Sequence, residues 1–227
     1  ARNDNLQDLL KRLKDIMAST RGSDMEIDIL VTNGSDAKKV QGFVTMSGGR
    51  TKIDKKDAVY KAVKDGKVGN ILLYRRNIAE TNTRNQLRQL INDFQSASAI
   101  PLFISIDQEG GKVNRFERLP GFPSMPSAFF LGNKNDTAAT RLYSDNIAGT
   151  LSNLGINLNY APALDVYNPN CPVIGARGRA FSSNPYKIAI HAEQVILSHN
   201  RFKVHTMVKH FPGHGNSLSD SHLGVAD

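Results

Sequence analysis

The sequence predicts an α/β fold in which parallel strands alternate with helices. The expected strands are runs of apolar residues rather than strict alternations of apolar and polar ones, which is typical of parallel strands covered on both faces. Segments with apolar residues at helical spacing separate them, and connections of this length favour parallel crossovers. Two architectures fit, an open doubly wound sheet and a (β/α) barrel. Both place functional groups at the carboxyl ends of the strands.

The elements follow one another in a regular order along the chain. Helices are predicted at 6–18, 54–65, 81–97, 136–154 and 185–200. Strands are predicted at 42–48, 70–75, 101–107, 156–166 and 204–211. The first helix is indicated by apolar residues at helical spacing, whereas the polar segment 19–39 stays unassigned. A long loop is expected between the third strand and the fourth helix.

Composition excludes several classes of protein. The chain has 227 residues, of which 40% are hydrophobic and 22% charged, as in ordinary globular proteins. Cys171 is the only cysteine, which excludes a disulfide-stapled miniprotein. No stretch approaches the roughly 20 apolar residues of a membrane-spanning helix, so no membrane span is expected.

The single cysteine suits the cytoplasm and the start at Ala1 suits a cleaved export signal. The compartment therefore stays open, as does the oligomeric state.

The chain is basic, with 29 Lys and Arg against 21 Asp and Glu and a formal net charge of +8. Acidic residues are interleaved with the basic ones, so we interpret the charge mainly as solvated helix surface. Attraction to an anionic partner is the alternative. Nucleic acid is not expected as a partner, because no basic stretch carries the aromatic side chains that stack on bases and the chain has no tryptophan.

Two predicted strands end in motifs that can carry chemistry. The third runs into D-Q-E-G-G-K-V-N-R (107–115), where a carboxylate at the strand end, Asp107, precedes two glycines that allow close approach of a ligand. A tight turn capped by the aspartate is the alternative. The fourth ends in A-P-A-L-D-V (161–166), and the glycine-rich loop after it contains Arg177 and Arg179. These arginines suit either a clamp on a polar ligand or a surface loop.

The fifth strand leads into K-H-F-P-G-H-G-N-S-L-S-D-S-H (209–222), which holds three of the six histidines. Pro and Gly break any helix here, so His210 and His214 are not a helical metal pair, although a metal-dependent site that also uses His222 stays open. Asp220 stands two residues before His222 and can accept a hydrogen bond from its imidazole. Such a pair fixes the tautomer and raises the basicity of the other ring nitrogen, as a general acid/base near neutral pH requires.

These motifs resemble bacterial family 3 glycoside hydrolases of the β-N-acetylglucosaminidase branch. The signature K-H-F-P-G-H-G, four residues, D-S-H is matched throughout 209–222. The motif D-x-E-G-G-x-V-x-R is matched by 107–115, and A-P-x-L-D-V by 161–166. The motif I-G-x-R-x-F is matched loosely by 174–181, which has two arginines and an extra glycine.

The resemblance implies a (β/α)8 TIM-type barrel. Residues 40–227 would form its N-terminal part, and residues 1–39 an N-terminal helix and polar segment that packs on the barrel. The five predicted strands fall short of eight, so we expect the barrel to be truncated after about the fifth strand. The family's nucleophile is an aspartate on a later strand, which is expected to be missing. The chain would then hold most of the substrate pocket without the full catalytic machinery.

The activity implied by the resemblance is removal of terminal β-linked N-acetylglucosamine, with retention of configuration, from peptidoglycan- or chitin-derived sugars. The resemblance implies His222 as the acid/base, oriented by Asp220. It also implies a substrate pocket, in which Arg177 is the alternative to Arg179. The pocket residues are Asp107, Arg115, Arg179, Lys209 and His210. The expected partner is a saccharide containing N-acetylglucosamine, with no cofactor and no metal. A sugar-binding protein or fragment of the same fold without catalysis is the alternative.

Overall fold

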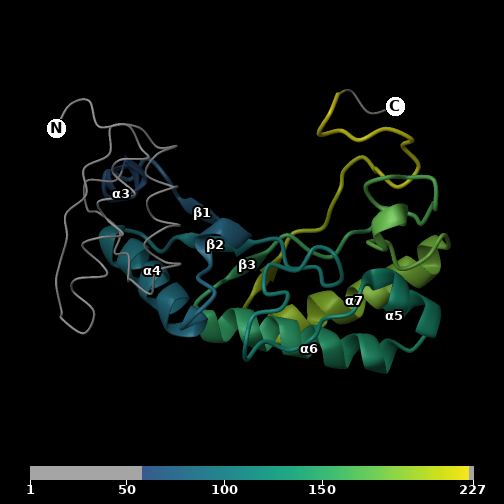
Figure 1. Ribbon diagram of the computed structural model, residues 1–227, viewed down its shortest axis with the longest axis horizontal. Coiled ribbons are helices and arrows are strands. Elements are labelled where there is room, and N and C mark those ends of the chain that lie inside the picture. Colours follow the sequence, from purple (N-terminus) through teal and green to yellow (C-terminus); the bar gives the residue numbers. More distant parts are fainter. Residues whose placement is uncertain (1–57, 225–227) are drawn as a thin grey trace, which may run out of the picture. The chain divides into compact units, whose positions relative to one another are not determined.

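The computed structural model describes residues 58–224, which lie in the second of two units of the chain, Lys55–Asp227 (Figure 1). The predicted helix at 6–18, the segment 19–39, the strand at 42–48 and the domain boundary after residue 39 lie outside the described residues. The helices are α3 (Ala58–Lys64), α4 (Thr83–Ala97), α5 (Ala128–Lys134), α6 (Thr137–Leu154) and α7 (Pro185–Arg201), with short 3-10 helices η1 (Arg75–Asn77) and η2 (Gly175–Arg177). The strands are β1 (Asn70–Leu73), β2 (Phe103–Ile106), β3 (Leu158–Asn159) and β4 (His205–Thr206).

The four described strands form one parallel sheet in the order β1-β2-β3-β4. In register, Asn70 lies opposite Phe103, Ser105 opposite Leu158, and Leu158 opposite His205. Each strand adds beside the one before it. A doubly wound sheet reverses its order at a switch point, whereas a barrel adds strands in sequence. Of the two predicted architectures, the described sheet therefore matches the barrel.

Strands β3 and β4 have two residues each, so the predicted strands at 156–166 and 204–211 are too long. Pro162 follows β3 closely and has no amide hydrogen to donate to a ladder. Parallel pairing resumes beyond it, where the Leu164 amide donates to the Lys209 carbonyl at 2.7 Å. This second stretch of pairing holds the segments that follow β3 and β4 side by side.

The predicted helices at 81–97, 136–154 and 185–200 are confirmed with shifts of one or two residues, as α4, α6 and α7. The Asp136 side chain caps the first turn of α6, and Gly155, with a φ of 86°, caps its C-terminal end. Asn184 caps α7 in the same way. Helix α5 lies in the segment predicted as a long loop. The Ser127 side chain caps it by accepting a hydrogen bond from a backbone amide.

The core is formed by the sheet and the long helices, which Figure 1 shows along one side of the strands. Ile104 and Ile106 of β2 have no exposed surface. Leu87 and Ile91, four residues apart on α4, are buried, as is Leu151 of α6. Burial of each such side chain contributes roughly 1.5–3 kcal/mol. This packing holds the strand ends, and the loops that follow them, in place.

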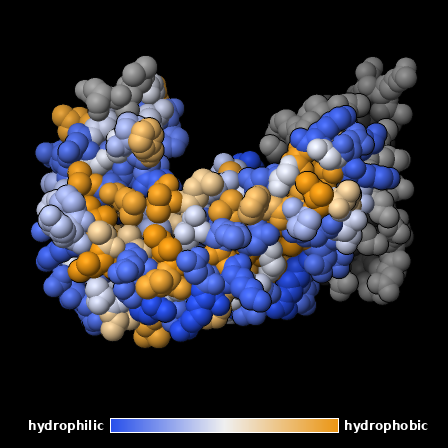
Figure 2. Space-filling view, turned by 180° about the vertical axis from the view of Figure 1, so that it is seen from behind, coloured by the Kyte–Doolittle hydropathy of each residue, from blue (hydrophilic) through white to orange (hydrophobic). Residues whose placement is uncertain are grey.

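The surface mixes polar and apolar side chains. Figure 2 shows exposed apolar residues interspersed with hydrophilic ones on the face turned away from the view of Figure 1. Such mixing is ordinary, because polar groups alone do not suffice to cover a folded chain. Among residues 58–224, none of the helices has the length and apolar character needed to cross a bilayer.

Candidate active site

Side chains from three strand ends meet at the carboxyl edge of the sheet. Asp107 directly follows β2, Asp165 lies beyond β3, and Lys209 and His210 lie beyond β4. Parallel strands that neighbour one another end at the same edge, so residues far apart in the sequence meet there. Lys209 Nζ thus donates to Asp107 Oδ1 at 2.8 Å across 102 positions of sequence.

An ion-pair cluster occupies the centre of this edge, and its members are Asp107, Glu109, Arg115, Arg179 and Lys209. Lys209 Nζ lies 2.8 Å from Asp107 Oδ1 and 2.6 Å from Glu109 Oε1. Arg179 binds both oxygens of Glu109, from Nε at 2.9 Å and from Nη2 at 2.7 Å. Arg115 Nη2 lies 3.4 Å from Asp107 Oδ2. The forked geometry of Arg179 on Glu109 is the strong form of such a pair.

The cations keep both carboxylates of the cluster ionised. Burial raises the pKa of Glu109, but hydrogen bonds and charge from Arg179 and Lys209 lower it more, so it falls below the ordinary value of 4.5. Burial also raises the pKa of Asp107, and Lys209 and Arg115 again outweigh it, leaving it below 3.8. Burial lowers the pKa of Arg179, whereas Glu109 raises it above its ordinary value.

Two glycines allow the chain to turn directly after Glu109. Gly110 and Gly111 have φ angles of 97° and 54°. A Cβ at Gly110 would collide with the Pro126 carbonyl, and one at Gly111 would lie 2.6 Å from Ser127 Cβ. The glycines of the D-Q-E-G-G motif therefore meet a steric requirement of this loop.

His210 joins the cluster to Asp165. Its Nδ1 lies 2.6 Å from Asp165 Oδ2, and its Nε2 lies 3.1 Å from Arg179 Nη2. A guanidinium only donates, so we assign Nε2 as the acceptor and Nδ1 as the protonated nitrogen that donates to Asp165. Burial raises the pKa of Asp165, but hydrogen bonds from His210 and from the His214 amide lower it more, leaving it below 3.8.

The Asp220–His222 pair lies in the exposed loop after β4. Asp220 Oδ1 accepts hydrogen bonds from the His222 backbone amide at 2.9 Å and from its Nδ1 at 2.6 Å. The His222 side chain is 77% exposed, and that of Asp220 is 22% exposed. Hydrogen bonds from the backbone and then the ring of His222 lower the pKa of Asp220. The carboxylate therefore holds the imidazole with Nδ1 protonated and Nε2 directed away from this contact.

His214 links this loop to the buried residues. Its backbone amide donates to Asp165 Oδ1 at 2.7 Å, and its Nε2 lies 2.9 Å from Ser221 Oγ. His214 thus contacts Ser221, which stands between Asp220 and His222, as well as Asp165, which in turn contacts His210 of the site.

Comparison with known proteins identifies the family. The family model "Glycosyl hydrolase family 3 N terminal domain" matches residues 35–227. The chain belongs to glycosyl hydrolase family 3. The N-terminal domain of this family has a TIM-barrel-like fold, with which the sequential parallel sheet of the chain agrees.

Curated relatives of this family 3 chain include the beta-hexosaminidase of Photobacterium profundum, which is 39% identical over 157 residues, covering 69% of this chain and 45% of that protein. The beta-hexosaminidase of Neisseria meningitidis serogroup C is 35% identical over 166 residues, covering 70% of this chain and 44% of that protein. The chain spans less than half the length of either relative.

Solved structures that resemble this chain agree with its assignment to family 3. NagZ from Neisseria gonorrhoeae has a TM-score of 0.67 at 33% identity, covering 74% of this chain and 49% of that one. A glycoside hydrolase family 3 beta-N-acetylglucosaminidase from Paenibacillus has a TM-score of 0.68 at 35% identity, covering 76% of this chain and 32% of that one.

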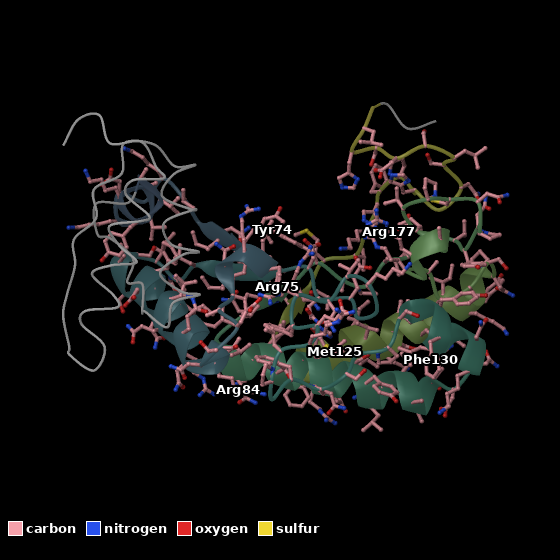
Figure 3. All side chains as sticks on the ribbon, viewed as in Figure 1. Tyr74, Arg75, Arg84, Met125, Phe130 and Arg177 are labelled. Atoms are coloured by element: carbon pink, nitrogen blue, oxygen red, sulfur yellow. The ribbon has the colours of Figure 1, made fainter. Side chains whose placement is uncertain are left out.

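The structure separates the two arginines of the loosely matched family 3 motif. Arg179 contacts Glu109 and His210, and its side chain is only 10% exposed. Arg177 is exposed and, with Phe129 and Tyr167, lines an open hollow of about 620 Å³. Figure 3 shows Arg177 beside the C-terminal segment, and its charge contributes to the low pKa of Asp220. Of the two arginines, Arg179 is therefore the one in the ion-pair cluster.

Two residues that the structure places in the site were absent from the predicted pocket of this family 3 chain. Glu109 pairs with two cations of the cluster, and Asp165 holds His210. Glu109 stands two residues after Asp107, which places both on the same side of an extended segment. Asp165 lies at the end of a predicted strand, as Asp107 does. The signal in the sequence that points to Glu109 and Asp165 is their position at or near the end of a predicted strand.

The alternative metal site built on His210, His214 and His222 finds no support in the geometry. Both ring nitrogens of His210 already contact Asp165 and Arg179. Within residues 58–224, no group of three or more His, Cys, Asp or Glu side chains is arranged to hold a metal ion.

Proposed function

We propose that the protein is a retaining exo-β-N-acetylglucosaminidase that hydrolyses terminal β-linked N-acetylglucosamine in peptidoglycan- or chitin-derived sugars. The observation that carries this proposal is the Asp220–His222 pair in a loop that His214 joins to Asp165, next to a cluster of fixed donors and acceptors. It is supported by membership of family 3 and by relatives that bear the name beta-hexosaminidase. Strands β1–β4 would be consecutive strands of a (β/α)8 barrel whose other strands lie outside the described residues.

The ion-pair cluster would bind the terminal sugar. Sugar hydroxyl groups both donate and accept, so they match a site that offers a carboxylate beside cationic donors. Asp107 would accept from one hydroxyl while Lys209 and Arg115 donate to others, with Arg179 and His210 completing the pocket. The pairing within the cluster holds these groups in place before the sugar arrives, which reduces the ordering cost of binding.

His222 would transfer the proton. As imidazolium it would give a proton to the glycosidic oxygen as the bond breaks, and as imidazole it would take one from water in the second step. Asp220 would hold the ring and stabilise its positive charge. Retention also needs a carboxylate nucleophile. The carboxylates of the cluster are already bound to cations, so we assign this role to none of them.

The test compares two substrates that differ in leaving group. In His222→Ala, cleavage of a β-linked N-acetylglucosamine disaccharide should fall by about 10²–10⁴-fold, whereas cleavage of an activated aryl glycoside, whose departure needs no proton, should fall far less. Asp220→Ala should show the same pattern more weakly. Equal losses on both substrates would overturn the assignment of the acid. Saturable binding of N-acetylglucosamine without turnover by the unmodified protein would instead support the alternative, a non-catalytic sugar-binding protein.

A further inference from the structure

An uncharged polar network lies directly behind the ion-pair cluster. Its members, Gln108, Asn159 and His199, have no exposed surface. Gln108 stands between Asp107 and Glu109. Side chains alternate along an extended segment, so the two carboxylates face Lys209 while Gln108 faces the interior.

Asn159 holds the backbone of Gln108 by both of its polar groups. Asn159 Oδ1 accepts from the Gln108 amide at 3.0 Å, and Asn159 Nδ2 donates to the Gln108 carbonyl at 3.0 Å. Regular pairing of β2 with β3 ends where Ile106 lies opposite Asn159. The asparagine side chain thus extends the ladder by one residue, Gln108, whose two flanking peptide groups join it to Asp107 and Glu109.

His199 determines which way the Asn159 amide points. Its Nδ1 lies 2.8 Å from the Val195 carbonyl, which only accepts, so Nδ1 carries the hydrogen. Its Nε2 is then an acceptor and receives a hydrogen bond from Asn159 Nδ2 at 3.0 Å. Rotation of the amide would place Oδ1 against the Nε2 lone pair and would reverse both contacts with Gln108. Burial lowers the pKa of His199 and so favours this neutral form.

The side chain of Gln108 carries the network to the other end of the loop. Its Oε1 accepts from the Arg115 amide at 2.8 Å, and its Nε2 donates to Asn114 Oδ1 at 2.8 Å. The same nitrogen lies 2.9 Å from the sulfur of Met125, which is labelled in Figure 3. The network therefore orients the backbone of Asp107, Glu109 and Arg115 together.

We propose that Asn159 and His199 are positioning residues for sugar binding. The neutral His199 fixes the Asn159 amide, the amide fixes the backbone of Gln108, and that backbone sets the Asp107 and Glu109 carboxylates against their cations. The inference rests on the proposed function for its ligand, a terminal N-acetylglucosamine residue. The contacts that lead from His199 through Asn159 to Gln108, which we call the relay, do not depend on that function.

The test uses two buried histidines of α7. His199→Leu removes the acceptor for Asn159, and His199→Gln returns a carbonyl oxygen near the place of Nε2. His191→Leu is the matched control, because His191 is equally buried on the same helix but its Nδ1 contacts Thr140 Oγ1 at 2.7 Å. The measurements are kcat and KM on an aryl β-N-acetylglucosaminide, ¹³C NMR titration of the Asp107 and Glu109 carboxyl groups, and Tm.

We expect His199→Leu to lower kcat/KM by roughly ten- to a hundredfold, as displaced binding groups do, and to move the pKa of Glu109 toward its ordinary value. His199→Gln should recover most of the activity. His191→Leu should lower Tm without changing either readout. Carboxyl titrations that stay the same in His199→Leu and His191→Leu would overturn the inference. An unmodified protein that does not bind N-acetylglucosamine would contradict the proposed function, whereas the carboxyl titration, which needs no turnover, would still decide the relay.

A second variant covers the case in which His199→Leu does not fold. Asn159→Asp keeps an acceptor for the Gln108 amide but loses the donor to His199 and to the Gln108 carbonyl. A carboxylate facing Nε2 should bring a second proton onto His199 at neutral pH, visible as an imidazolium signal in ¹⁵N NMR, together with altered titration of Glu109. A neutral His199 in this variant, with Glu109 titrating as in the unmodified protein, would overturn the inference.

Discussion

The ion-pair cluster and the Asp220–His222 pair are built in opposite ways. Glu109 and Arg179, the central pair of the cluster, have side chains that are 7% and 10% exposed, and they are joined across 70 positions of sequence. His222 is 77% exposed and contacts a residue two positions away. The first arrangement depends on the whole fold, whereas the second depends on one turn of the loop.

This difference matches the two tasks that we assign to the regions. Recognition of a sugar benefits from charges that are held rigidly and shielded from water, because electrostatic attraction is stronger there. Proton transfer needs a group that the glycosidic oxygen and then a water molecule can reach. A change in the cluster should therefore affect both stability and binding, and a change in the pair should affect the reaction alone.

The largest effect on stability is expected from Glu109→Gln. It keeps the shape of the side chain but leaves Arg179 and Lys209 without their shared carboxylate, so the free energy of unfolding should fall by about 3–5 kcal/mol, as for a broken buried ion pair. The measurement is urea unfolding at neutral pH. The control is Glu117→Gln, whose carboxylate is 58% exposed and lies 3.7 Å from Arg118. Equal losses in the two variants would show that the cluster contributes no more than a surface pair.

A smaller loss of stability is expected when the pH is lowered. The pKa of Glu109 lies below 4.5 and those of Asp107 and Asp165 lie below 3.8 in the folded chain. These carboxylates contribute fully to the free energy of unfolding at pH values above their ordinary pKa values. The contribution is lost as the pH falls through the lower pKa values of the folded chain. Unfolding free energies measured from pH 6 downward should therefore fall steeply below about pH 4.5.

The same acid series compares the two regions directly. Glu109→Gln should flatten the slope, because it removes one of the titrating groups. Asp220→Asn should change the slope little, since its partner His222 is 77% exposed and water screens the attraction between them. A flatter slope in Asp220→Asn than in Glu109→Gln would mean that the exposed pair, rather than the cluster, dominates acid sensitivity.

The smallest effect is expected from Arg177→Ala. Arg177 is exposed, so its removal should change the free energy of unfolding by less than about 0.5 kcal/mol. Arg179→Ala should cost several times more, because it leaves the Glu109 carboxylate buried beside one cation fewer. Thermal unfolding of the two variants side by side checks this, and a larger loss in Arg177→Ala would contradict the separation of the two arginines.

Much of the fold was predictable because it depends on local patterns. Helices α4, α6 and α7 were predicted nearly to the residue, since apolar spacing and capping residues act within one or two turns. Helix α5 was missed because it is short and lies among glycines and prolines. The lengths of β3 and β4 were wrong, because pairing is interrupted around Pro162 and the apolar pattern alone does not show where a ladder breaks.

The candidate site divides in the same way. The sequence by itself predicted the Asp220–His222 contact, because residues two positions apart are close enough to meet within one turn. It also placed Asp107 and Lys209 at strand ends, where parallel order brings them to one edge. Only the tertiary structure decided that Arg179 rather than Arg177 binds Glu109, that Asp165 holds His210, and that His199 stands behind Asn159. These contacts join segments far apart in the chain, and their partners are selected by how strands and helices pack rather than by any spacing along the sequence.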